Sequence, residues 1–166
     1  MKKTIAMFLL CASASLASAD VLWGKARAGD SLSDVQAAYP GGRVLPPSED
    51  RTLKTGAVQR YVLPGVDVGS DQFDASFYFK DEALSQVTLK QETPNGLLRC
   101  DGKFEELELA LRSKYGRELH ADRVGKTRDS TFVSGRTAIQ LNMFAFDGCM
   151  ILIVYNNRIS STADKL

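Results

Sequence analysis

The sequence predicts an α+β fold: a tandem helix-plus-antiparallel-sheet repeat in which the helices pack on one sheet face. Three observations support this prediction. Two helical patterns end at Tyr39-Pro40-Gly41 and Tyr115-Gly116, several alternating strand patterns follow each of them, and a linker with proline and glycine separates the two groups. We therefore expect one domain over residues 20–155, with half-repeats at about 20–92 and 97–155. Residues 156–166 are expected to form a flexible tail.

Residues 1–19 have the parts of a secretory signal peptide. Lys2 and Lys3 give a positive start, an apolar run follows that is too short to cross a bilayer, and Ala17-Ser18-Ala19 is a cleavage pattern. We expect cleavage before Asp20, export to a bacterial periplasm, and no stable membrane insertion. A buried N-terminal helix is the alternative.

The first helix is predicted to begin at Ser31. Its hydroxyl can cap the first amides, and Asp34 three residues later completes a capping-box pattern. Leu32, Val35 and Tyr39 would share one face, and the following proline and glycines end the helix.

The second helix is predicted to follow Asp101, which can cap it. Glutamates fill its first half and basic residues its last turn, an order that suits the helix dipole. The apolar residues Phe104, Leu107, Leu111 and Tyr115 would line one face. Gly116 ends the helix.

Eight strands are predicted from alternating and apolar runs. They lie at residues 43–45, 57–63, 72–80, 84–91, 118–124, 130–133, 137–146 and 149–155. Asp147-Gly148 predicts a type I′ hairpin turn. The last strand is apolar on both faces, so we expect it to be central and covered on both.

Cys100 and Cys149 are expected to form a disulfide. Cys11 would leave with the signal peptide, and an even pair in an oxidising compartment is typical of a bridge. A loop of this length gives roughly 4 kcal/mol of stabilisation in the chain-entropy model. A reactive thiol is the alternative, but the chain has no Cys-x-x-Cys.

The sequence lacks the patterns of common catalytic and metal sites. The only histidine is His120, on a predicted strand, and no Gly-x-Ser-x-Gly, Ser-x-x-Lys or His-Glu-x-x-His occurs. The spacing of Asp67, Asp71 and Asp74 does not match a calcium loop. We therefore assign no catalytic residue, no metal ligand and no cofactor, and we expect the protein not to be an enzyme.

Charge argues against nucleic acid as a partner. The 21 basic and 20 acidic side chains nearly cancel. Arg123, Lys126 and Arg128 form a small basic patch without interleaved aromatic residues, which is a poor footprint for nucleic acid.

A protein partner is the remaining class, and the polar sheet face is the candidate surface. Its predicted outward residues are Asp74, Ser76, Tyr78, Gln86, Thr88, Lys90, Gln140, Asn142 and Phe144. We assign partner binding to Asp74, Tyr78 and Lys90, and to Glu49, Asp50 and Arg51 in a charged loop. An ordinary solvated sheet face is the alternative.

Two short stretches carry a family resemblance. Gly29-Asp30-Ser31-Leu32-Ser33-Asp34-Val35 opens the first helix, and Lys114-Tyr115-Gly116 closes the second. With the signal peptide and the two cysteines, they resemble the β-lactamase inhibitory protein architecture. They also resemble the small outer-membrane-assembly lipoproteins of the SmpA/OmlA family, but no lipid-attachment cysteine follows the signal peptide. The resemblance implies binding to another protein.

Three functions follow from these observations. The first is a periplasmic inhibitor or immunity protein that blocks a partner enzyme or imported toxin. The second is an envelope-assembly accessory protein. The third is an enzyme, such as a hydrolase, that uses His120. In the first two cases the partner is a periplasmic or imported protein.

Overall fold

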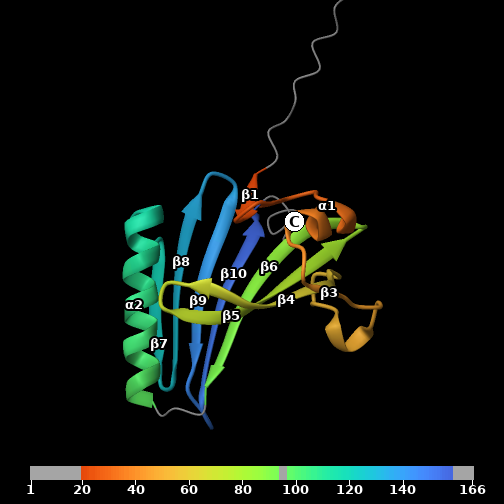
Figure 1. Cartoon of the computed structure of the whole chain (residues 1–166). Helices are drawn as coiled ribbons and strands as arrows, with labels where there is room; N and C mark the ends of the chain where they lie inside the picture. Colours follow the sequence, from red (N-terminus) through yellow and green to blue (C-terminus); the bar gives the residue numbers. More distant parts are fainter. Residues whose placement is uncertain (1–19, 94–96, 159–166) are drawn as a thin grey trace, which may run out of the picture.

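The computed structural model describes residues 20–93 and 97–158, so the expected signal peptide lies outside the described residues (Figure 1). Two helices, a short 3₁₀ helix and ten strands follow in the order β1 (Val21–Trp23), β2 (Ala26–Arg27), α1 (Leu32–Ala38), β3 (Arg43–Val44), η1 (Glu49–Arg51), β4 (Val58–Val68), β5 (Asp71–Lys80), β6 (Ala83–Thr93), α2 (Leu97–Tyr115), β7 (His120–Val124), β8 (Thr127–Ser134), β9 (Thr137–Phe144) and β10 (Cys149–Asn157). Within the described ranges, no helix has the length and apolar character needed to cross a bilayer.

Eight strands form one antiparallel sheet in the order β3-β4-β5-β6-β10-β9-β8-β7. Its centre is the direct pairing of β6 with β10, in which Leu89 lies opposite Ile153. The sequence missed strands β1 and β2, which pair as a separate two-stranded sheet.

The predicted tandem helix-plus-sheet repeat is wrong. The molecule is mainly one large sheet with two unequal helices, the seven-residue α1 and the 19-residue α2. The shared Tyr-Gly endings are general helix-stop signals, so they carry no information on helix length or on which strands share a sheet.

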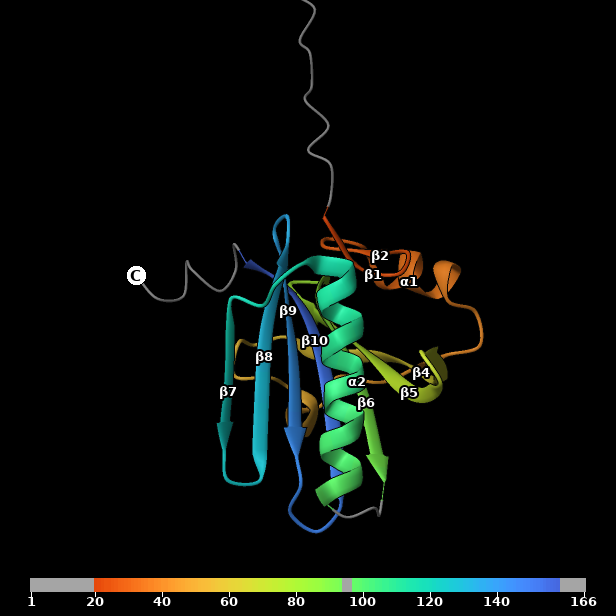
Figure 2. The same cartoon turned by 90° about the vertical axis from the view of Figure 1, so that its left-hand side faces the viewer.

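The core lies on one face of the large sheet, which we call the core face. The residues at alternate positions on its strands are buried, as Phe77, Val87, Leu141 and Ile153 show. Helix α2 covers this face over β8, β9 and β10 (Figure 2). Its buried residues Phe104, Leu107 and Leu111 share the predicted face, and Leu22, Ala26 and Val35 of the N-terminal elements join the same core.

Strands β4 and β5 run across the direction of β6, β9 and β10, so the sheet curls around its core (Figure 1). The tip of the β4–β5 hairpin reaches α2. There Lys103 forms ion pairs with Asp71 and, at 2.8 Å, with Glu106, and Ser70 Oγ lies 3.4 Å from a Glu106 carboxylate oxygen. These contacts join the hairpin to the helix at the rim of the core.

Helix α1 begins as predicted. The Asp34 amide donates to Ser31 Oγ at 3.2 Å, and the Ser31 amide donates to the Asp34 carboxylate at 2.9 Å. Tyr39, just beyond the helix, stacks on Trp23 at 5.4 Å between ring centroids. Its hydroxyl accepts from the amide of Lys25 at 2.7 Å and donates to the carbonyl of Trp23 at 2.9 Å, which fixes the β1–β2 turn.

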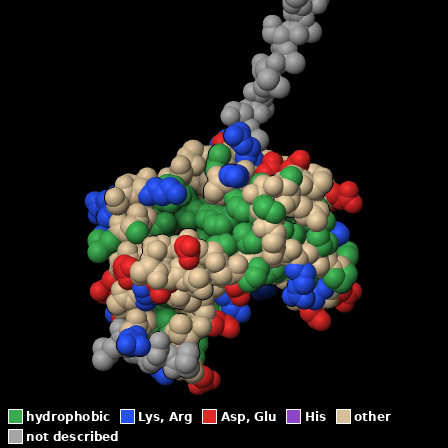
Figure 3. Space-filling model, viewed as in Figure 1, with side chains coloured by type: hydrophobic (Ala, Val, Ile, Leu, Met, Phe, Trp, Pro, Cys, Tyr) green, Lys and Arg blue, Asp and Glu red, His purple; other side chains and the backbone are tan. Residues whose placement is uncertain are grey.

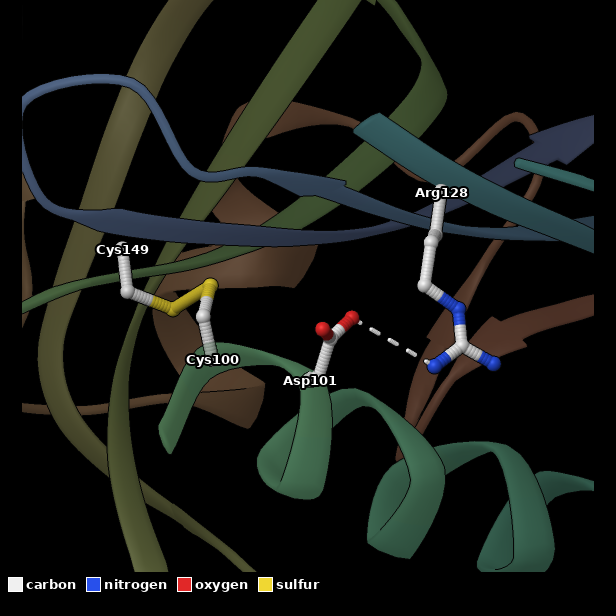
Figure 4. The surroundings of a disulfide bond; sticks show 4 residues. All are labelled: Cys100, Asp101, Arg128 and Cys149. Carbon is white, nitrogen blue, oxygen red and sulfur yellow. Dashed lines mark ion pairs between the residues drawn. A yellow bond between two sulfur atoms is a disulfide. The ribbon is translucent and has the colours of Figure 1, made fainter. Parts of the chain in front are cut away.

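The Cys100–Cys149 disulfide is present, with a Cα–Cα distance of 5.4 Å, and it joins α2 to the start of β10 (Figure 4). Asp101 is not the predicted helix cap, because α2 begins at Leu97. Its carboxylate instead faces Arg128 of β8, with 3.6 Å between Asp101 Oδ1 and Arg128 Nη1. The Arg128 guanidinium lies over the Phe104 ring. Ion pairing and the disulfide therefore hold the first turns of α2 on the sheet.

Three further predictions about the end of the chain need correction. The type I′ turn at Asp147-Gly148 is wrong, because four residues separate β9 from β10 and neither of these two has the positive φ that this turn requires. Strand β10 is central but covered on one face only. Asn156 and Asn157, expected in the tail, belong to β10, and residues 159–166 of the expected tail lie outside the described residues.

Candidate functional site

The face of the large sheet opposite the core is the candidate functional surface, and we call it the open face. The pairing register places rows of side chains across it, such as Asp74, Lys90, Leu152, Asn142 and Asp129. Both helices and the β1–β2 hairpin contribute to the core on the other side. Most side chains of the open face are half-exposed, while Thr88 at its centre is buried.

Asp74 and Lys90 lie directly opposite each other on β5 and β6. Asp74 Oδ1 accepts a hydrogen bond of 3.1 Å from the Gly65 amide on β4. Lys90 Nζ lies 2.8 Å from a carboxylate oxygen of Glu92, and both of these side chains are about half exposed. Asp74 and Lys90 therefore each present a charged group to solvent at one end of the open face.

Tyr78 lies four residues along β5 from Asp74, about 13 Å away for an extended strand. It faces Gln86 across the ladder and is half-buried. Burial raises the pKa of its phenol, so the hydroxyl is neutral at physiological pH. Tyr78 therefore offers a rigid ring with a hydrogen-bonding tip, apart from the Asp74–Lys90 pair.

Glu49, Asp50 and Arg51 form the 3₁₀ helix η1 beside the start of β4. Arg51 Nη2 donates to the carbonyl of Pro46 at 2.9 Å, and a bridge between Thr52 and Val58 closes the loop. Since Gln59, the residue after Val58, pairs with Tyr78, this loop lies nearer to Tyr78 than to Asp74 and Lys90. The structure thus places the predicted binding residues in two groups rather than in one cluster.

The sequence predicts Phe144 on the open face but misses the apolar residues of β10 beside it. Met150, Leu152 and Val154 alternate with the buried residues of β10 and are only partly buried, as is Phe144 opposite Met150. The apolar pattern of β10 predicts burial on both faces, and this prediction is wrong. The small number of predicted helices was the available signal, because two helices cannot cover both faces of eight strands.

A hollow of about 410 Å³ lies at the end of this apolar strip, beside the β9–β10 turn. Phe144, Met150 and the exposed Phe146 form its apolar wall, and Glu92 and Asp147 bring carboxylates to it. Aromatic and methionine side chains around a concave site are typical anchors of protein interfaces.

Carboxylates outnumber cations on and around the open face. Asp67, Asp74, Glu92, Asp122 and Asp129 lie on it and Asp147 lies beside it, against the cations Arg43, Lys80 and Lys90. The arginines of strands β7 and β8 instead pair with α2: Arg123 with Asp101 at 2.9 Å and Arg128 with Glu105 at 3.1 Å. The open face is therefore acidic around an apolar centre.

His120 lies on β7, on the predicted strand, and is exposed. Its Nε2 is 3.5 Å from a carboxylate oxygen of Asp129. This places the single histidine at the outer edge of the open face, with Asp122 and Asp129 as neighbours.

A second apolar surface faces the viewer in Figure 3, where hydrophobic side chains gather in a hollow above the β4–β5 hairpin. Several hydrophobic residues pack against the core without being fully buried: Trp23, Tyr39, Leu63, Val66 and Tyr115. These side chains stabilise the curled sheet, and the sequence did not single them out as a surface.

No protein-family model, curated protein or solved structure matches the chain.

Proposed function

We propose that the protein is a binding module of the bacterial periplasm that uses its open face to block a partner protein, as an inhibitor or an immunity protein. The observation that carries the proposal is the strip Phe144, Met150, Leu152 and Val154, four apolar side chains that stay partly exposed within a polar sheet face. Contiguous exposed apolar side chains with a polar rim are typical of interaction sites.

The surrounding groups suit recognition of a protein surface. Aromatic and methionine side chains supply apolar area, and Tyr78, Gln86 and Asn142 supply hydrogen-bonding groups that can adapt to a partner. The excess of carboxylates favours a partner whose contacting surface is basic, because opposite potentials steer association and orient the complex.

The disulfide and the rigid sheet support action outside the cytoplasm. Cys100 and Cys149 are both buried and bonded, a state that persists in oxidising compartments. Export is tested by N-terminal sequencing of the protein recovered from the periplasm, which should begin at Asp20. A first residue at Met1 would contradict the signal-peptide proposal.

Binding is tested with matched surface variants. Immobilised protein is exposed to periplasmic extract, the retained partner is identified, and its affinity is measured for Leu152→Ser with Phe144→Ser. We expect at least about tenfold weaker binding, because hot-spot side chains each contribute more than about 1.4 kcal/mol. Leu109→Ser is the control, since Leu109 is 60% exposed on α2, away from the open face.

The partner's activity separates the two candidate functions. A secreted hydrolase or toxin that loses activity on binding supports the inhibitor or immunity role. A component of outer-membrane assembly that keeps its activity supports an accessory role instead. Equal loss of binding in the Leu109→Ser control, or none in the open-face variant, would show that the open face is not the binding surface.

A further inference from the structure

The outer edge of the open face brings three potential metal ligands together. His120 and Asp122 occupy alternate positions of β7, so their side chains share a face. Asp129 on β8 lies directly opposite Asp122. One ligand atom from each of these residues lies within 4.8 Å of the others.

We propose that His120, Asp122 and Asp129 form a divalent-cation site whose best fit is zinc. One imidazole nitrogen and two carboxylate oxygens are ligands that zinc accepts. Two ligands about 2.1 Å from a tetrahedral zinc are about 3.4 Å apart. The separation of His120 Nε2 and Asp129 Oδ2 is 3.5 Å, so this edge of the tetrahedron is already set.

The charges on the two strands independently favour a cation at this position. Asp122 and Asp129 are like charges directly opposite each other on neighbouring strands, an arrangement that destabilises a sheet. Their neighbours Arg123 and Arg128 reach α2, where they pair with Asp101 and Glu105. Because both arginines are engaged on the core side, they do not neutralise the repulsion between Asp122 and Asp129. A bound divalent cation would offset that repulsion.

Solvent exposure completes the argument for a three-ligand site. His120 and Asp122 are exposed and Asp129 is half-exposed, so water can occupy the remaining position of a tetrahedral ion. This inference does not rest on the proposed protein-binding function. The competing explanation is that charged side chains protect the edge strand β7 from pairing with other chains.

Zinc alone is the probe for the experiment. The protein, with its disulfide formed and without a histidine tag, is titrated with Zn²⁺ by calorimetry, and the imidazole nitrogens are followed by NMR. Because His120 is the only histidine of the chain, every imidazole signal belongs to it. We expect saturation at one Zn²⁺ per chain and a shift of the Nε2 resonance that follows the calorimetric saturation.

Variants on both strands then locate the ion. His120→Ala and Asp129→Asn should each weaken Zn²⁺ binding about tenfold or more, since even residues that only support metal ligands contribute that much. Asp67→Asn is the control, an exposed carboxylate of the same face on β4. Zinc should also raise the melting temperature of the native chain and leave that of His120→Ala unchanged.

Three results would overturn the proposal: no saturable binding, an unshifted Nε2 resonance at saturation, or unchanged affinity in His120→Ala. Any of them would leave edge protection as the role of these charges. The NMR measurement on the native protein keeps the test decisive even if a variant folds poorly.

Discussion

The two faces of the large sheet differ in how deeply they bury the side chains of the same strand. On β10, Ile151, Ile153 and Tyr155 are at most 4% exposed, while Met150, Leu152 and Val154 between them are only partly buried. All six side chains are apolar or aromatic, so composition does not distinguish the faces. The difference comes from α2 and the N-terminal elements, which cover one side only.

Electrostatics separates the faces in the same way. On the core side of β7 and β8, arginines pair with carboxylates of α2, and Glu108 accepts a hydrogen bond from the buried Ser130. On the open side of the same strands, carboxylates face each other. Opposite charges thus pair on the core side of these strands, while the open side leaves carboxylates and apolar area in contact with solvent.

Among the variants that test this difference between the faces, Phe77→Ala is expected to have the largest effect. Phe77 is fully buried on the core face and contacts the rings of Trp23, Tyr39 and Tyr61. We expect a loss of about 3–5 kcal/mol in the free energy of unfolding, measured by urea titration, from lost burial and the remaining cavity. Val154→Thr on the open face should change it by less than about 1 kcal/mol, because the partly exposed position lets the new hydroxyl contact water. Equal losses would remove the distinction between the faces.

Removing the disulfide tests how much the covalent link between α2 and β10 contributes to stability. Cys149→Ala should lower the free energy of unfolding by about 2–5 kcal/mol, because the 49-residue separation gives a large unfolded-state loop. Denaturant titration measures the loss, and reductant added to the native protein should reproduce it. A melting temperature that does not change on reduction would contradict this expectation.

Tyr39→Phe tests how much the N-terminal elements that cover part of the core face contribute to stability. It keeps the ring that stacks on Trp23 but removes the hydroxyl bonded to Lys25, Ala26 and Trp23. We expect a loss of about 1–3 kcal/mol by thermal unfolding, because backbone groups of the tight turn lose a shared partner. An unchanged stability would mean that water replaces the hydroxyl.

The smallest effect is expected where the β4–β5 hairpin meets α2. Contact with the Lys103 ammonium lowers the pKa of Asp71. The pair's contribution is therefore present above the ordinary carboxyl pKa near 4 and is lost as pH falls through the lower folded-state pKa. Asp71→Asn should cost less than about 1 kcal/mol at pH 7, and the difference from the native protein should vanish between about pH 5 and pH 2.

Sequence reasoning succeeded where local physical rules decide the structure. The Ser31–Asp34 capping box, the apolar face of α2, the approximate positions of the eight strands of the large sheet and the disulfide were all predicted from spacing and residue type. These features depend on neighbours in the chain or on chemistry that two cysteines share.

The failures concern contacts between distant segments. The pairing of β6 with β10 makes one sheet out of two predicted halves, and no local pattern encodes that choice. The half-exposure of Leu152 likewise depends on which face α2 covers, and the meeting of His120 with Asp129 depends on the register of β7 with β8. Residue types alone do not determine the strand pairing, the covered face or the register.

The pairing of β6 with β10 also sets an order for folding. The hairpins on either side can form from neighbouring residues, but the central pairing must close a loop of on the order of fifty residues that contains α2 and β7 to β9. Before this pairing forms, β6 and β10 each have an exposed backbone edge, which is where strands of separate chains can associate. The pairing of β6 with β10 is therefore the step at which these two edges are protected from aggregation.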